Sequence, residues 1–448
     1  MTTAAHVLAA CFAVLSAEAF ETRQIFREER FTRGDVNLRP LQAIDEAAWI
    51  WTKGAGFEDG NAFPIIRFRR DFTADGTPLV FDVSADPRYV LLLDGCVISR
   101  GPHKGFPGRW YYQSYEIRDL SAGEHVLEAV VFHLGRNGPP SILTSGRGGF
   151  VLKAEGVYDT RLTTGKTAWR AACVPCQTYG GVTDPDTMTG RENIVRGTGF
   201  LDWHDLAWQP TTVVREPVRA SDYGNPCRGW ALFPTERMDE QERPCTPGTV
   251  RAAQPLFDET NAVYTAADTA SAWTVRFDRL LKAGARVEIP ARTSVRFLWD
   301  LGDYYCAFPD LGTSGGAGAQ VRWRWAEALY APFAETGRTG ELYLHKGNRD
   351  EFLGKRMLRA MHDTFLPDGR ASASFTTPWW KCGRWIEIAV RTADAPLALT
   401  RLGLVESRYP LEVKSSFACD DASLDGICRI AVRGMENCLH EMFMDCPY

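Results

Sequence analysis

Apolar and polar residues alternate with a period of two over much of the chain, which predicts short β-strands. The stretch "IIRFRRDF" places Ile66 and Phe68 on one face of a strand. "PLVFDVSA" and "RYVLLLDG" follow, and the second ends on Asp94 and Gly95, a dipeptide that favours a hairpin turn. Because strands recur at this spacing with no helical period between them, we predict a β-sandwich or jelly roll over residues 45–224.

A second block of alternating residues lies further along the chain. "VRWRWAEALY" places Val321, Trp323 and Trp325 on one face, and "RWIEIAVRTADAPLALTRLGLVES" adds at least two more strands. These patterns predict a second β-sandwich over residues 255–414. The stretch between the two blocks, residues 225–254, is rich in proline and charge and is expected to be a linker.

The period changes to 3.6 residues after "SSFACDD", which predicts a helix within residues 415–448 with Asp421 as its N-cap. Its apolar positions are Leu424, Ile427, Cys428, Ala431, Met435, Cys438, Leu439 and Met442. One interpretation is an amphipathic strut that docks on the second sandwich. The other, which we favour because the closing "DCPY" carries no helix cap, is the first helix of a further, truncated helical domain.

Composition narrows the functional classes. The chain has 448 residues, 45% of them hydrophobic and 24% charged, which is typical of a globular protein with two to four domains. A formal net charge of −5 offers no basic field, so nucleic acid is not expected as a partner.

The N-terminal segment, residues 1–44, resembles a signal peptide in part. It has an apolar run from Val7 to Leu15 and an A-x-A pattern at Ala17 and Ala19, but no Lys or Arg precedes the run. A secreted or periplasmic location and a cytoplasmic one both stay open. Elsewhere no apolar run is long enough to span a bilayer, so no membrane span is expected.

Several cysteines and carboxylates invite a chemical role. Cys173 and Cys176 form "CVPC", but no second C-x-x-C pair completes a zinc site, so scattered thiols and no metal or cofactor are expected. Asp300 and Asp303 in "WDLGDYY" bracket a glycine, which turn chemistry explains better than a catalytic pair. Glu327 follows a strand, and a structural role is expected for it.

Three stretches taken together carry a family resemblance. The first, Phe68–Ile117, contains "DG", "GP" and a Trp-Tyr pair, and the second, Phe297–Tyr330, contains a D-x-G turn, a glycine-rich link and "AEAL". The third is Phe375–Val390, and "ENCLHEMFMDCPY" follows it at the end of the chain. In this order they resemble the bacterial α-L-rhamnosidases of glycoside hydrolase family 78. Those enzymes consist of β-sandwich modules that lead into an (α/α)6 barrel, and the likeness covers nearly the whole chain from Trp49 onward.

The resemblance implies inverting hydrolysis of terminal α-L-rhamnose from a rhamnose-containing glycoside or polysaccharide. Only Asp445, in "MDCPY", matches an active-site position of the family, where the corresponding Asp binds hydroxyls of the rhamnose ring. The general acid and base are implied to lie beyond Tyr448. The chain as given is therefore expected to contain no catalytic residues and to be inactive, which leaves its own status as an enzyme uncertain.

The alternative is a stand-alone carbohydrate-binding β-sandwich protein. A strand through Trp110, Tyr111 and Tyr112 would place Trp110 and Tyr112 on one face, beside Arg109 and His103, where an aromatic ring suits a pyranose. These two residues are candidate sugar contacts, unless this face docks on a further domain. An incomplete helical domain would also expose apolar residues, so a homo-oligomer stays open.

Overall fold

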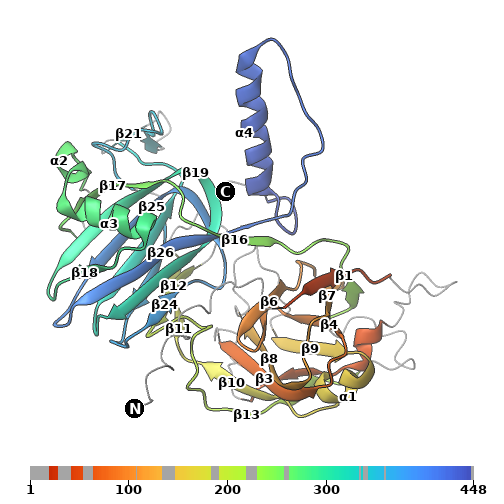
Figure 1. Ribbon diagram of the computed structural model, residues 1–448. Coiled ribbons are helices and arrows are strands. Elements are labelled where there is room, and N and C mark those ends of the chain that lie inside the picture. The colour runs from red at the N-terminus through yellow and green to blue at the C-terminus, as the bar shows by residue number, and fades with distance from the viewer. Residues whose placement is uncertain are drawn as a thin grey trace, which may run out of the picture. The chain divides into compact units, whose positions relative to one another are not determined.

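The computed structural model describes residues 20–28, 42–53, 64–106, 108–133, 147–182, 191–217, 230–256, 262–331, 334–336, 342–357 and 360–444. The chain divides into two compact units (Figure 1). Unit 1 contains Met1–Pro175 and Trp203–Glu240, and unit 2 contains Cys176–Asp202 and Gln241–Tyr448. Both are built chiefly of strands, which confirms the predicted mainly β fold with two sandwich-like domains.

Unit 1 is a sandwich of two sheets whose pairings are antiparallel except between β15 and β7. The first sheet has the order β1 (Thr22–Ile25), β7 (Trp110–Ile117), β4 (Leu79–Asp86), β9 (Gly149–Ala154), β2 (Trp49–Trp51) and β14 (Thr212–Arg215), with β15 (Leu232–Pro234) beside β7. The second has the order β13 (Gln209–Pro210), β10 (Arg170–Val174), β3 (Ile65–Ala74), β8 (Gly123–Phe132), β5 (Arg88–Leu93) and β6 (Cys96–Gly101). Short helical turns lie at η1 (Ala43–Glu46), η2 (Gly156–Tyr158) and α1 (Asp159–Leu162).

The core of unit 1 follows the period of two read from the sequence. Ile66 and Phe68 of β3 are fully buried and meet inward residues of β4, among them Phe81, in one apolar cluster. The predicted hairpin after "RYVLLLDG" is present, because β5 and β6 pair directly across Asp94 and Gly95, both at positive φ (50° and 81°). Alternation and turn chemistry therefore predict this part of the fold well.

Unit 2 is organised around an 11-stranded sheet. Its main order is β11 (Gln177–Val182), β12 (Arg191–Arg196), β23 (Met361–Leu366), β20 (Gln320–Ala326), β25 (Lys381–Arg391), β19 (Ser294–Gly315), β26 (Leu397–Arg408) and β16 (Gln241–Cys245). β17 (Thr249–Gln254) and β24 (Ala373–Phe375) pair with β19, β18 (Val287–Ile289) pairs with β26, and β21 (Ala334–Thr336) forms a hairpin with β22 (Leu342–Leu344). The helices are α2 (Ala266–Thr269), α3 (Ala272–Ala283) and α4 (Ala422–Cys438).

The long strand β19 joins two parts of this sheet. Its first half pairs with β17 and β25, and its second half pairs mainly with β26 and β24. The register with β25 breaks between Asp300 and Tyr305, and Gly302 within the break adopts a φ of 76°. A glycine at positive φ lets the strand bulge and turn, so β19 contributes to both parts.

The core of unit 2 contains the aromatic positions that the sequence predicted. Trp323 and Trp325 of β20 are completely buried in one cluster with residues of β19, β25 and β26. α3 covers this core with Phe277, whose ring stacks on Phe297 at 4.1 Å between centroids. Ser271 caps the start of α3 by accepting a hydrogen bond from the Thr274 amide.

The unit boundaries differ from the expected domains. The expected linker, residues 225–254, contains three strands, β15, β16 and β17. Residues 176–202, expected in the first sandwich, lie in unit 2, because β12 pairs in parallel with β23. Proline and charge did not prevent strand formation here, since an edge strand such as β16 tolerates both.

α4 confirms the predicted amphipathic helix and its cap, because Asp421 accepts a hydrogen bond from the Ser423 amide. Its C-terminal half is held against β19 and β26 through Arg433, which lies 3.1 Å from Asp303 and 3.0 Å from Glu406. In Figure 1 the helix stands away from the strands over most of its length. Its apolar stripe is exposed along Ile427, Ile430, Ala431, Gly434 and Met435.

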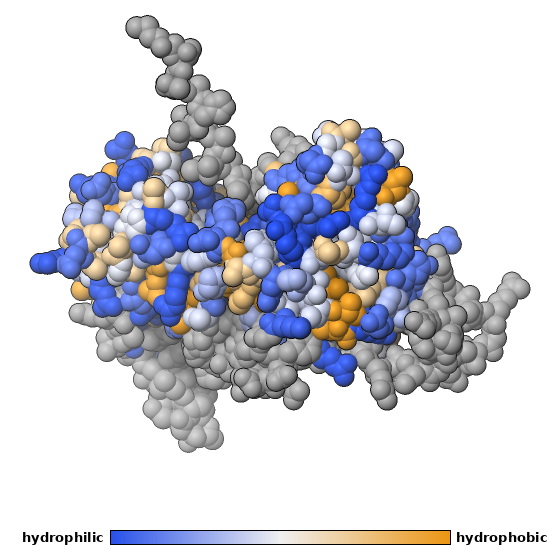
Figure 2. Space-filling view, turned by 90° about the horizontal axis from the view of Figure 1, so that it is seen from below, coloured by the Kyte–Doolittle hydropathy of each residue, from blue (hydrophilic) through white to orange (hydrophobic). Residues whose placement is uncertain are grey.

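Figure 2 shows one face of the molecule, on which apolar residues form small patches separated by polar ones. Within the described residues, no helix combines the length and hydropathy that crossing a membrane requires.

Candidate functional site

Asp445, the residue matched to a substrate-binding position, lies outside the described residues. Its proposed role therefore stays a prediction. The other two predicted contacts, Trp110 and Tyr112, are placed on one face of β7, as the strand pattern indicated.

Trp110 and Tyr112 are buried in this structure, where only 3% and 2% of their surfaces are exposed. Their role as sugar contacts stays a prediction. Leu232 and Pro234 of β15 lie beside Trp110 and Tyr112 in the parallel register. Ile44, Trp49, Trp230 and Leu232 pack with the two rings in one buried cluster. The indole of Trp110 donates a hydrogen bond to the Ala85 carbonyl (3.0 Å). The strand pattern did not indicate this packing, because Trp230 and Leu232 belong to the stretch interpreted as a linker and Ile44 to the N-terminal segment.

The half-buried ring of β7 is Tyr111, on the opposite face. The guanidinium carbon of Arg237 lies 4.7 Å from its centroid, and that of Arg109 lies 5.8 Å from it and 4.5 Å from the Phe233 centroid. Arg109 also donates to the Tyr111 hydroxyl at 3.1 Å. The aromatic surface on this side is thus engaged in cation–π contacts within the unit.

His103 does not join that surface. It is buried, and its Nδ1 lies 2.6 Å from the Thr235 hydroxyl. Burial, with the charges of Arg237 and Arg88, lowers the pKa of His103 to about 3, so the ring is neutral at physiological pH. His103 thus belongs to the interior of unit 1, and the sugar-facing role considered for it is not supported.

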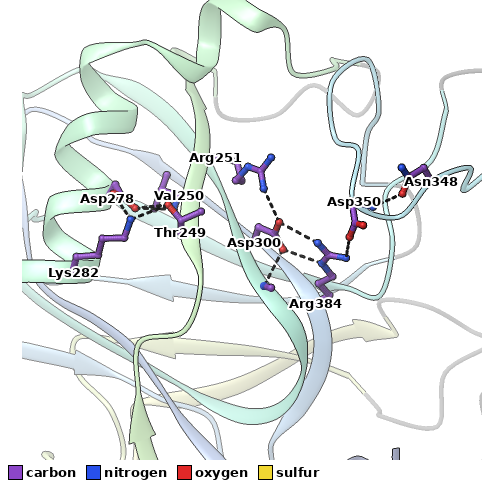
Figure 3. Close-up of polar contacts among 10 residues, drawn as sticks. Thr249, Val250, Arg251, Asp278, Lys282, Asp300, Asn348, Asp350 and Arg384 are labelled. Atoms are coloured by element: carbon purple, nitrogen blue, oxygen red, sulfur yellow. Dashed lines mark hydrogen bonds and ion pairs between the residues drawn. The ribbon is translucent and has the colours of Figure 1, made fainter. Parts of the chain in front are cut away.

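The carboxylates Asp300 and Asp303 are separated and ion-paired rather than facing each other. Figure 3 shows the Asp300 carboxylate between Arg251 and Arg384, with nitrogen–oxygen distances of 3.1 Å and 2.9 Å. Asp300 Oδ1 also accepts a hydrogen bond from the Gly302 amide at 3.0 Å. This agrees with the turn chemistry expected for the pair, because Asp300 fixes the bulge of β19 at Gly302.

A second polar cluster, the Tyr304 cluster, consists of Tyr304, Cys306, Glu327, Cys382 and Arg433. The Tyr304 hydroxyl lies 3.0 Å from Glu327 Oε1 and 3.2 Å from Cys382 Sγ. The main-chain carbonyl of Tyr304 accepts a hydrogen bond from Arg433. Burial, reinforced by Cys382 and Glu327, raises the pKa of Tyr304 well above its usual value. The phenol therefore stays protonated and acts as a hydrogen-bond donor.

Three carboxylates near Arg433 form ion pairs with arginines. An inverting mechanism needs a protonated acid and a base about 6.5–9.5 Å apart, flanking the bond. Arg433 holds Asp303 and Glu406, and Glu436 contacts both Arg408 (3.0 Å) and Arg433 (3.2 Å). Each of these three carboxylates therefore already has an arginine partner.

No metal-binding site is evident in the part of the chain that the structure describes. No group of three or more His, Cys, Asp or Glu residues in that part is arranged to hold an ion. Cys173 and Cys176, the "CVPC" pair, are both thiols.

Comparison with known proteins relates the chain to α-L-rhamnosidases through structure alone. No family model matches the chain, and no curated protein sequence matches it. The GH78 family rhamnosidase of Bacillus sp. GL1 has a TM-score of 0.65 at 14% identity, covering 90% of this chain and 59% of that one. The α-L-rhamnosidase of Dictyoglumus thermophilum has a TM-score of 0.50 at 16% identity, covering 90% of this chain and 40% of that one. The α-L-rhamnosidase of Aspergillus terreus has a TM-score of 0.51 at 15% identity, covering 90% of this chain and 41% of that one.

This likeness establishes a shared fold. The chain spans less than two thirds of the length of each of these proteins. It therefore has the fold of a part of α-L-rhamnosidases, while the activity named for those proteins belongs to the complete molecules.

Proposed function

We propose that this chain forms the β-sandwich part of an α-L-rhamnosidase-like glycoside hydrolase. The observation that supports this best is the fold likeness to the Bacillus rhamnosidase, which extends over 90% of the chain. That extent includes both β units and not only one common sandwich module. The substrate class proposed is a glycoside or polysaccharide that carries terminal α-L-rhamnose.

We assign the general acid and the general base to a helical domain that is not formed by the described residues. The chemistry supports this assignment, because an acid with a raised pKa needs a partly dry pocket next to an ionised partner. Asp300, Asp303 and Glu406 are each held in an ion pair with an arginine. Asp445 is proposed to bind hydroxyls of the rhamnose ring in the complete site.

α4 is proposed to be the first helix of that domain. Its exposed stripe follows the i, i+3, i+4, i+7 spacing of a helix face that packs on other helices. Ala431 and Gly434 lie within the stripe, and a Cβ added at Gly434 would meet no atom within 4 Å. Small residues in an open stripe allow another helix to approach closely.

The test compares two proteins on an aryl α-L-rhamnoside. One is the 448-residue chain, and the other is the chain translated from the same coding DNA continued past codon 448. We expect the continued chain to release the aryl group with inversion at the anomeric carbon, and the 448-residue chain to show no turnover above background. In the continued chain, Asp445→Asn should raise KM, because it removes a contact to the sugar hydroxyls.

Two outcomes would contradict the proposal. Turnover by the 448-residue chain would show that it holds its own acid and base. A stop codon directly after codon 448, or a continued chain without rhamnosidase activity, would remove the hydrolase role. Saturable binding of L-rhamnose to the 448-residue chain in that case would favour the stand-alone carbohydrate-binding protein.

A further inference from the structure

Two cysteines in the Tyr304 cluster lie directly opposite each other in a sheet. Cys306 of β19 pairs with Cys382 of β25 in the antiparallel register, and both side chains are thiols. Opposed residues of antiparallel strands have Cα atoms about 4.5–5.5 Å apart and side chains on the same face. A disulfide needs Cα atoms about 4.4–6.8 Å apart, so the backbone already meets this requirement.

The surroundings favour reaction at Cys382. Cys306 lies opposite Cys382 in the strand register, and the Tyr304 hydroxyl lies 3.2 Å from the Cys382 sulfur. Both groups, Cys306 first, lower the pKa of Cys382 although burial opposes them. Because the thiolate is the nucleophile in disulfide exchange, the partly exposed Cys382 is the expected point of attack.

Cys306 also contacts the end of α4. Its Sγ lies 3.4 Å from the main-chain oxygen of Asn437, in the last turn of the helix. Carbonyls of the last turn lack a partner within the helix, so a thiol donor there helps to hold the helix end in place. The proton of Cys306 serves either Cys382 or Asn437 at one time, and a disulfide removes it from both.

We propose that Cys306 and Cys382 form a reversible disulfide site whose oxidation weakens the attachment of the C-terminal end of α4 to β19. The oxidant is a low-molecular-weight disulfide such as glutathione disulfide. The Cys382 thiolate attacks one of its sulfurs and releases one thiolate. The Cys306 thiolate then attacks the Cys382 sulfur of the mixed disulfide and releases the second. Two protein thiols are oxidised to one disulfide, the small disulfide is reduced to two thiols, and the two protein protons pass to them.

Two other cysteines of unit 2, Cys245 and Cys419, fit this role less well. Burial, together with the charge of Glu406, raises the pKa of Cys245 to about 11, which keeps it protonated and unreactive. Cys419 is exposed near the start of α4 and lies in no strand ladder.

Peptide mapping without reduction tests the bond itself. After incubation of the folded 448-residue chain with glutathione disulfide, the main linked pair should join the peptides that contain Cys306 and Cys382. Cys306→Ser should instead accumulate glutathione on Cys382, because the second thiol is missing. Cys173→Ser, at an exposed cysteine of unit 1, should form the Cys306–Cys382 bond as the wild type does. Absence of this linked pair, or predominance of another, would overturn the proposal.

Hydrogen exchange tests the coupling to α4. Oxidation of the wild type should speed exchange in the last turn of α4 about two- to threefold, as expected for the loss of one weak hydrogen bond. Cys382→Ser keeps the Cys306 donor but removes the attacking thiol, so its exchange should not respond to the oxidant. Cys306→Ala should exchange at the faster rate without oxidant. Equal α4 exchange in oxidised and reduced wild type would overturn the coupling, and neither readout depends on rhamnoside hydrolysis.

Discussion

Asp300 shows what a single buried carboxylate does in unit 2. Its side chain is 4% exposed and contacts two guanidinium groups as well as the amide of Gly302. Breaking a buried, hydrogen-bonded ion pair by removing one partner leaves the other charge without compensation. We expect Asp300→Ala to lower the free energy of unfolding by about 2–4 kcal/mol in urea denaturation.

Asp350 provides the matched control for this prediction. It also contacts Arg384, at 2.6 Å, but its side chain is 78% exposed. Exposed ion pairs contribute about 0–1 kcal/mol, so Asp350→Ala should change unfolding little. Equal effects of the two substitutions would contradict the structural role given to Asp300.

Asp239 gives unit 1 a pH dependence of its own. Its carboxylate accepts hydrogen bonds from the Tyr115 hydroxyl (2.6 Å) and from the Gln113 amide (2.7 Å), and burial raises its pKa to about 6. Because the folded-state pKa lies above the unfolded one, the folded state binds this proton more tightly. The resulting stabilisation is complete below about pH 4 and is lost as the pH rises through about 6.

Asp239→Asn tests this sign. The wild type should lose about 2 kcal/mol of unfolding free energy between about pH 4 and pH 7 relative to the variant, whose amide does not titrate. Urea denaturation of both proteins at a series of pH values measures the difference. A difference that stays constant with pH, or that grows in favour of the wild type as the pH rises, would refute the raised pKa.

The sequence predicted the burial of a residue correctly where the local alternation of apolar and polar residues determines it. It failed where contacts with a distant segment determine the burial. The faces of Val321, Trp323 and Trp325 followed from alternation, since a buried face needs a period of two. The cluster that buries Trp110 and Tyr112 includes Trp230 and Leu232, more than 100 positions later, and no local pattern predicts that contact.

At the scale of elements, α4 combines a well-anchored end with a bare apolar face. Arg433 of α4 pairs with Glu406, and Glu436 of α4 pairs with Arg408 of β26. Ile430 is nevertheless 74% exposed and Ile427 58% exposed. A helix stripe of this kind is stabilised by burial against a partner surface. The helix and its Asp421 cap were predictable, because helix periodicity and capping are local properties of the sequence.

The exposed stripe predicts association of the 448-residue chain. Sedimentation velocity should show a concentration-dependent dimer or larger species that Ile430→Lys shifts toward the monomer, because a charge in the contact must be desolvated. Val275→Lys is the matched control, since Val275 is a 54% exposed apolar residue on α3, outside the stripe. A wild-type chain that stays monomeric, or equal effects of both variants, would exclude the stripe as the contact.

At the scale of the whole molecule, each unit is built from two separate stretches of the chain. Residues 176–202 leave unit 1 and add β11 and β12 to the sheet of unit 2, before the chain returns to unit 1. The parallel pairing of β12 with β23 joins Ile194 to Thr364 across the sequence. Hydrophobic periodicity identifies strands but not their partners, so a sequence reading assigns such a segment to the nearest block.

The exchanged segment should be required for the stability of unit 2. Asp363 of β23 is fully buried and accepts hydrogen bonds from the main-chain and side-chain nitrogens of Asn193, at 3.0 Å and 2.7 Å. A chain of residues 241–448 lacks Asn193 and leaves β23 as an uncovered edge strand, which favours association with other chains. A chain of residues 176–448 keeps β11 and β12 in their natural connection and serves as the control.

We expect the longer chain to unfold cooperatively in urea, and the shorter one to aggregate or to unfold at lower urea concentration. Equal urea midpoints and equal solubility of the two chains would mean that β12 does not stabilise unit 2. The parallel pairing of β12 with β23 would then not explain why residues 176–202 belong to unit 2.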